Sequence, residues 1–274
     1  MSNTFDDESP IKEDLEPLII VLKTDPDWNK RFGAASKLFR LGKEKAIDPL
    51  IHALQNDSHN EIRRFACDLL GKLGDPRATW ALIATLRQGL IDKDNVIVHH
   101  ATEALLLLRV GDLSGILIST VTDTEEFFEM RIKSLELLGK IADNESVEGL
   151  ISIIKNPDTD GKIRGKAIEE LIYTGHLAGL QMILEQLEKT RRKDFKKIVV
   201  RALGKTPFKN KTIVFRIGEI LLTISEQEEK KSKKDSDLLF YIAEALKNLA
   251  NNIGYEFSDF MDELIKLRNK QKSK

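Results

Sequence analysis

The sequence offers few side chains with the spacing of metal ligands. His99 and His100 are adjacent, so on a helix they point about 100° apart and cannot both face one ion. His99 and Glu103 lie four residues apart and could share a helix face, but a single pair is a weak ligand set. We therefore expect no metal site.

Nucleophile and cofactor motifs are also missing. Cys67 stands at a small-residue position of an apolar helical stripe, where a thiol serves in core packing. The chain contains no Gly-rich phosphate loop, no Ser nucleophile elbow and no Cys-x-x-Cys pair. We predict no catalytic residue and no cofactor, and hence a protein that is not an enzyme.

Positive charge gathers in one segment. Residues 188–216 hold eleven Lys and Arg against two acids, a balance of +9 in a chain with a net charge of −1. Four of these basic residues recur every fourth position and so form a stripe along one helix face. The stripe is either a solvated face with internal contacts or a surface for an anionic partner, an acidic protein or nucleic-acid phosphates. The basic residues that we predict to bind a partner are Arg192, Lys193, Lys196, Lys197, Arg201 and Lys205.

These residues belong to a repeating pattern. A small or apolar residue followed four positions later by Leu recurs at intervals of 32 to 43 residues. A period of this length predicts an array of stacked units. The pairs, of which the last follows a polar insert, are Ala34/Leu38, Ala66/Leu70, Ala101/Leu105, Ser134/Leu138, Ala167/Leu171, Val199/Leu203 and Ile242/Leu246.

Each unit is predicted to be two helices joined by a tight turn, because apolar residues recur three and four apart. In IRRFACDLLGKLGDPRATWALIATL, Gly74 suits a helix C-cap and Pro76 can open the next helix. Helices of about a dozen residues are marginal alone in water, so each must bury its stripe against a neighbouring unit.

The units resemble the short HEAT-like repeat of the phycobilisome-lyase (PBS lyase) type, with its Ile-Arg, Ala-Ala, Leu-Gly and closing Leu-Ile…Ala-Leu elements. The resemblance is clearest in the stretch quoted above, in KRFGAASKLFRLGKEKAIDPLIHAL and in MRIKSLELLGKIADNESVEGLISII, and it covers residues 11–225. It implies an all-α fold, a right-handed α-α superhelix or HEAT-like solenoid. We expect about six helical-hairpin repeats after an N-terminal half-repeat cap. The HEAT-like deoxyhypusine hydroxylases carry iron ligands in His-Glu dipeptides, and no such pair occurs here.

An acidic residue precedes an arginine by six positions in four units. Planar guanidinium groups suit bidentate pairing with carboxylates, so we interpret these pairs as a structural ladder that ties adjacent inter-repeat turns together. The pairs are Asp25/Arg31, Asp57/Arg63, Glu125/Arg131 and Asp158/Arg164.

The resemblance also implies that the second helix of each repeat lines a concave surface. Outward positions on those helices, counted from the core leucines, form a row in which Trp80 is the one large aromatic. Trp and Arg are typical interface hot spots, although Trp80 could instead cover the next repeat. The residues of this row that we predict to bind a partner are His52, Trp80, Arg87, Glu148 and Lys155.

The boundaries follow from where the pattern stops. We predict a disordered acidic tail over residues 1–9, one solenoid domain over 10–268 and a basic tail over 269–274. Residues 225–237 have no apolar stripe and are predicted to be a polar loop insert.

Composition places the chain among soluble proteins. It is 41% hydrophobic and 32% charged, and its apolar runs fall short of the roughly eighteen residues that a membrane span needs. The acidic start, MSNTFDDESPIKED, is unlike a signal peptide. We expect a cytoplasmic monomer that does not bind membranes.

Three functions remain open from the sequence. The first is a non-enzymatic protein-protein interaction scaffold that presents a concave helical surface and a basic patch. The second is a bilin-lyase-like subunit that handles a tetrapyrrole, although the chain is poor in spare aromatic residues. The third is binding of a nucleic-acid backbone through the basic sixth repeat.

Overall fold

The computed structural model describes residues 14–108 and 112–272, whose regular structure is helical and contains no strand. The contacts group the chain into two compact units. Unit 1 is Met1–Leu113 and unit 2 is Ser114–Lys274.

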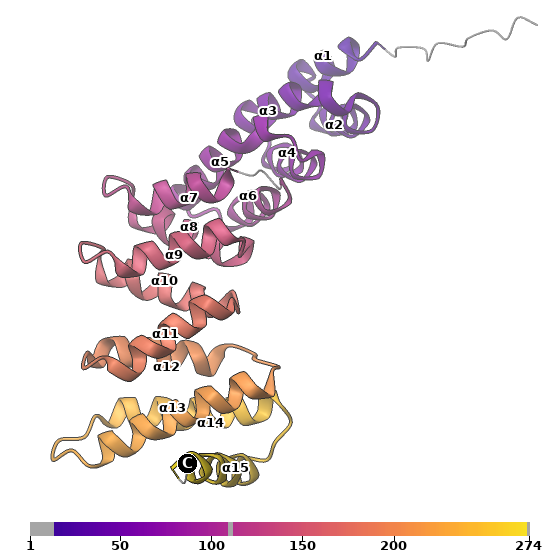
Figure 1. Cartoon of the computed structure of the whole chain (residues 1–274). Coiled ribbons are helices and arrows are strands. Elements are labelled where there is room, and N and C mark those ends of the chain that lie inside the picture. The colour runs from indigo at the N-terminus through magenta and orange to yellow at the C-terminus, as the bar shows by residue number, and fades with distance from the viewer. Residues whose placement is uncertain (1–13, 109–111, 273–274) are drawn as a thin grey trace, which may run out of the picture. The chain divides into compact units, whose positions relative to one another are not determined.

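Unit 1 follows the predicted repeats (Figure 1). The half-repeat is α1 (Glu16–Thr24), and short 3-10 turns precede the second helices. The remaining helices are α2 (Trp28–Gly42), α3 (Ile47–Asn56), α4 (Asn60–Leu73), α5 (Thr79–Asp92) and α6 (Asn95–Leu107).

Unit 2 begins within α7 (Leu113–Thr122) and continues the alternation of first and second helices. Its helices α8 to α13 supply the fourth to sixth predicted repeats, and α14 and α15 supply the final unit. They are α8 (Phe128–Ile141), α9 (Asn144–Lys155), α10 (Gly161–Tyr173), α11 (Leu177–Lys189), α12 (Lys193–Lys205), α13 (Lys211–Glu229), α14 (Ser236–Asn252) and α15 (Phe257–Lys272).

Each unit is built from two layers of helices. In unit 1, α2, α4 and α6 pack side by side in one layer and α1, α3 and α5 in the other. In unit 2, α8, α10, α12 and α14 form the first-helix layer, and α11, α13 and α15 pack together in the second. This stacking is the all-α solenoid arrangement that the period predicts.

The repeated apolar positions form the core. The leucines that define the period, from Leu38 to Leu203, are fully or almost fully buried, and so are Leu54, Leu86, Ile154 and Leu187 on the second helices. Burial of one such side chain stabilises the fold by about 2 kcal/mol. The core positions predicted from the repeat are therefore confirmed.

The predicted turn chemistry is also present. Gly74 adopts the left-handed conformation, with φ of 68°, and its amide donates to the Leu70 carbonyl at the end of α4. Pro76 then opens a short 3-10 turn, where the Asp75 side chain accepts a hydrogen bond from the Arg77 amide.

The polar segment 225–237 is more ordered than predicted. Helix α13 continues to Glu229, because the buried Glu228 carboxylate accepts hydrogen bonds from Lys231 and from the Asp235 amide. Helix α15 likewise extends to Lys272, so most of the predicted basic tail is helical, and Arg268 pairs with Glu226 of α13. The predicted tail over residues 1–9 lies outside the described residues.

Candidate functional site

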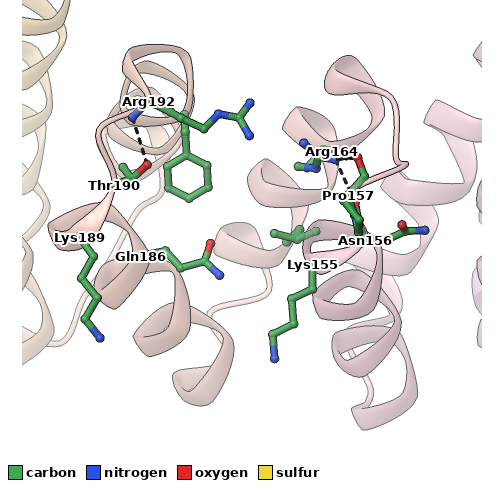
Figure 2. A pocket seen from close by; sticks show the side chains of 10 residues that line it. Lys155, Asn156, Pro157, Arg164, Gln186, Lys189, Thr190 and Arg192 are labelled. Atoms are coloured by element: carbon green, nitrogen blue, oxygen red, sulfur yellow. Dashed lines mark hydrogen bonds between the residues drawn. The ribbon is translucent and has the colours of Figure 1, made fainter.

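A basic groove of about 400 Å³ lies in unit 2, between the α9–α10 turn and the α11–α12 turn (Figure 2). Two buried apolar residues form part of its lining, and four cationic side chains contribute to the rest without any acidic one. The lining residues are Ile154, Lys155, Asn156, Pro157, Arg164, Gln186, Lys189, Thr190, Arg192 and Phe195.

Arg164 holds one wall of the basic groove. Its Nη2 atom donates to the carbonyl oxygens of Asn156, Pro157 and Thr159, each at 2.9 Å. These carbonyls belong to the turn that follows α9, where backbone acceptors lack helical partners. The arginine thus fixes the turn and leaves its positive charge at the groove.

Arg192 holds the opposite wall. Its backbone amide donates to Thr190 Oγ1 at 3.2 Å, and its guanidinium lies 2.9 Å from the Asp194 carboxylate. Both side chains of this ion pair are more than half exposed, so solvent screens it strongly.

Lys155 and Lys189 close the groove from the ends of α9 and α11. Both are exposed, and Figure 2 shows their side chains extending in the same direction from neighbouring helices. Across residues 14–108 and 112–272, no carboxylate lies within ion-pair distance of either ammonium group. These two charges are therefore available to an anionic ligand.

Unit 1 contains a groove at the same place in the repeat, with a volume of about 640 Å³. Gln55 of unit 1 comes directly after a core residue, as Lys155 does in unit 2. Gln88 comes two positions after a core leucine, as Lys189 does in unit 2. Asp94 precedes the lining residue Ile97 by three positions, as Arg192 precedes Phe195. The unit 1 groove is lined by one arginine, Arg63, and two acids, Asp92 and Asp94, so the balance of charge at this place differs between the two units.

The predicted basic stripe on α12 is largely occupied inside unit 2. Lys197 Nζ lies 3.0 Å from carboxylate oxygens of both Asp235 and Asp237, at the start of α14. Lys193 lies 3.9 Å from Asp235, and the Arg201 guanidinium stacks 5.2 Å above the Tyr241 ring. Three of the four stripe residues thus make contacts inside unit 2.

The two remaining basic residues of α12 differ from each other. Lys196, predicted to be a partner contact, is buried, and that burial lowers the pKa of its ammonium group. Lys196 is therefore not accessible to a partner, and its predicted role as a partner contact is wrong. Lys205 is exposed and lines a shallow groove of about 170 Å³ between α12 and α14.

Of the predicted arginine ladder, one arginine joins adjacent turns, and its carboxylate partner differs from the one predicted. Arg31 donates to both carboxylate oxygens of Asp57, at 2.8 and 2.7 Å, and to the Asp25 carbonyl at 2.8 Å. The carboxylate that it binds is the acid of the next repeat, and this one pair joins adjacent turns as expected.

The other ladder arginines bind backbone carbonyls. Arg63 donates to the Asp57 carbonyl at 3.1 Å and Arg131 to the Val121 carbonyl at 2.8 Å, as Arg164 does after α9. Within the described part of the chain, neither Glu125 nor Asp158 forms an ion pair with its predicted arginine. The repeated arginine therefore caps the end of the preceding second helix, where carbonyl oxygens and the helix dipole favour a cation.

The outward row predicted on the second helices is exposed. Trp80 stands at the second position of α5 with 67% of its surface exposed, and Arg87 lies two turns further along. His52 of α3 and Glu148 of α9 are also exposed. The row is thus accessible on helices of both units.

His99, His100 and Cys67, the candidate ligands and nucleophile of the sequence, have different surroundings in the structure. His100 Nδ1 lies 2.7 Å from Asp68, while His99 is exposed. Cys67 is buried, which raises the pKa of its thiol to about 12. Among the residues with described positions, no three His, Cys, Asp or Glu side chains are grouped to hold a metal ion.

Sequence reasoning missed Lys189 and the grouping of Lys155, Arg164 and Arg192 in one groove. Their positions relative to the core residues could have indicated this grouping. Lys155 comes directly after Ile154, and Lys189 comes two positions after Leu187 on the next second helix. What the sequence did not reveal was that the α9–α10 and α11–α12 turns face each other.

The stacked helical hairpins define an α-helical repeat protein. Residues 15–106 match the family model for HEAT repeats, in agreement with the HEAT-like repeats that the sequence predicts there, and the helical hairpins continue through the rest of the described chain. No curated protein matches the sequence.

Two solved structures are similar at low sequence identity. Human deoxyhypusine hydroxylase in complex with glycerol is 17% identical with a TM-score of 0.38, over 87% of this chain and 86% of that one. The complex of CpcE and CpcF of phycocyanin lyase from Nostoc sp. PCC7120 is 19% identical with a TM-score of 0.36, over 96% and 99%. Among the described helices, none has the length and apolar character to cross a bilayer.

Proposed function

We propose that this HEAT-like repeat protein is a non-enzymatic scaffold that binds other proteins through the outward faces of its second helices. The observation that carries the proposal is the exposure of Trp80. On the same helix, Leu82 and Leu86 are completely buried, so α5 has filled its core positions without this ring.

A tryptophan in this position favours protein binding. Its side chain offers a large rigid apolar surface, and burying it against a partner would contribute about 2–4 kcal/mol. Aromatic residues of this kind often dominate the binding energy of an interface. The outward side chains also differ from repeat to repeat while the core leucines recur, so recognition can vary on a constant frame.

The test is to capture partners with the wild-type chain and to measure the affinity of the purified partner for Trp80→Ala. We expect a loss of at least tenfold with unchanged helicity, because the substitution removes an exposed ring and no core contact. Leu41→Ala is the matched control, since Leu41 is 52% exposed but lies on a first helix. Equal binding by all three proteins would contradict the role of Trp80.

The other two functions predict different results with the same preparation. A bilin-lyase-like subunit would bind an added tetrapyrrole and show visible absorption. A nucleic-acid-binding protein would show retention on nucleic acid that falls steeply with salt. The scaffold proposal predicts neither result.

A further inference from the structure

The geometry of unit 2 points to a defined ligand for the basic groove: an acidic segment of a partner protein, carrying two or more Asp or Glu side chains. This inference rests on the proposed function in one respect, that the partner is a protein. It concerns a different surface from Trp80, so each can be tested separately.

The argument begins with charge. Four cationic side chains line the groove and no acidic one does, although the whole chain is nearly neutral. Among the described residues, these four side chains form one ion pair, the exposed contact between Arg192 and Asp194, which water screens. Lys155 and Lys189 have no internal counter-charge among the described residues. Carboxylates placed between the two walls would gain from the converging potential.

The lysines of the groove are not required by the fold. The groove in unit 1 has the same place in the repeat, yet it carries Gln55 and Gln88 where unit 2 carries Lys155 and Lys189. Glutamine is therefore compatible with the packing of these turns. A binding role explains positive charge at positions where the repeat itself accepts a neutral side chain.

A protein segment fits the groove better than a nucleic acid does. The adjoining basic residues Lys193 and Lys197 are paired with Asp235 and Asp237, so the positive charge does not continue as a long track. A nucleic-acid backbone gains affinity from many phosphate contacts along such a track. Phe195 lines the groove but is only 8% exposed, which leaves its ring unsuited to stacking with nucleotide bases.

The experiment uses the full chain and fluorescence anisotropy with a fluorescein-labelled hexaglutamate peptide. Lys155→Gln/Lys189→Gln gives the unit 2 groove the side chains of its unit 1 counterpart. We expect this variant to bind the peptide at least tenfold more weakly than wild type, and we expect wild-type affinity to fall as salt is raised. Lys23→Gln/Lys37→Gln removes the same charge from exposed sites in unit 1 and should leave binding unchanged.

Two results would overturn the inference. One is equal peptide affinity for wild type and the groove variant, with both folded by circular dichroism. The other is a labelled oligothymidylate that binds more tightly than the peptide and depends on the same two lysines. Trp80→Ala should bind the peptide normally. If the groove variant binds the peptide normally while Trp80→Ala still weakens partner binding, only this inference is rejected. If neither variant weakens its binding, the scaffold proposal is rejected as well.

Discussion

At the scale of single residues, Arg31 of α2 joins one repeat to the next. Arg31 is buried between two turns, where it binds the Asp57 carboxylate in bidentate geometry and the carbonyl of Asp25. Burial opposes ionisation of Asp57, but hydrogen bonds from Arg31 and from the His59 amide outweigh it, so the pKa of this carboxyl lies below its usual value of 3.8.

We predict that Arg31→Ala lowers the free energy of unfolding of unit 1 by about 2–3 kcal/mol at pH 7, because it leaves a buried carboxylate without its counter-ion. The measurement is urea unfolding followed by tryptophan fluorescence. Arg77→Ala, which removes an exposed guanidinium paired with Asp75, should change stability little.

The effect of Arg31→Ala should depend on pH. A carboxyl with a lowered folded-state pKa contributes its stability above the unfolded-state value, and that stability is lost as the pH falls through the folded-state value. The difference between wild type and Arg31→Ala should therefore shrink below about pH 4. A difference that stays constant down to pH 2 would exclude the Asp57 carboxylate as the cause.

At the scale of helices, glycines after the core leucines let the first helices approach closely. A Cβ built on Gly71 of α4 would lie 2.7 Å from the Ala104 Cα of α6. Gly204 of α12 meets Ala245 of α14 in the same way, at 2.9 Å. The Leu-Gly element of the repeat is thus a packing requirement between neighbouring first helices.

Gly71→Ala should destabilise unit 1 by about 1–3 kcal/mol, because the added methyl group overlaps backbone atoms of the next helix. Gly33→Ala is the matched control, since Gly33 lies within α2 and an added Cβ would meet nothing within 4 Å. That variant should be more stable than wild type by about 0.5–1 kcal/mol. Urea midpoints measured by fluorescence would reject the packing argument if both substitutions shifted them in the same direction.

At the scale of the whole molecule, the chain consists of two compact units with the same repeat architecture. Repeat arrays are held by contacts between neighbours, so cooperativity need not extend along the full chain. Both tryptophans, Trp28 and Trp80, lie in unit 1, which makes their fluorescence a local probe of that unit. Far-UV circular dichroism reports the helices of both.

We predict that urea unfolding curves from fluorescence and from circular dichroism do not coincide, because the two units unfold at different urea concentrations. Gly204→Ala should then shift the circular dichroism curve while leaving the fluorescence curve in place, since α12 and α14 belong to unit 2. Coincident curves for wild type, moved together by Gly204→Ala, would show that the chain unfolds as one cooperative body.

The sequence by itself determined the helical repeats, their order, the core leucines and the Gly74 turn. These features depend on local periodicity, because a short helix must place its apolar residues three and four apart to bury them. The local pattern did not predict that helix α13 extends into the polar segment 225–237, because the contacts that stabilise this extension are not part of the apolar repeat. Glu228 accepts a hydrogen bond from the Asp235 amide, and Glu226 pairs with Arg268, which lies 42 residues further along the chain.

Only the tertiary structure decided which charges are free. Lys197 and Asp237 are 40 residues apart, and their pairing occupies one lysine of the α12 stripe inside unit 2. Lys155 and Lys189 belong to different repeats, and the stacking of α9 to α12 brings them to one groove without a carboxylate. A local pattern specifies which face of a helix is buried, but the partner of a surface charge is set by whichever distant helix packs beside it.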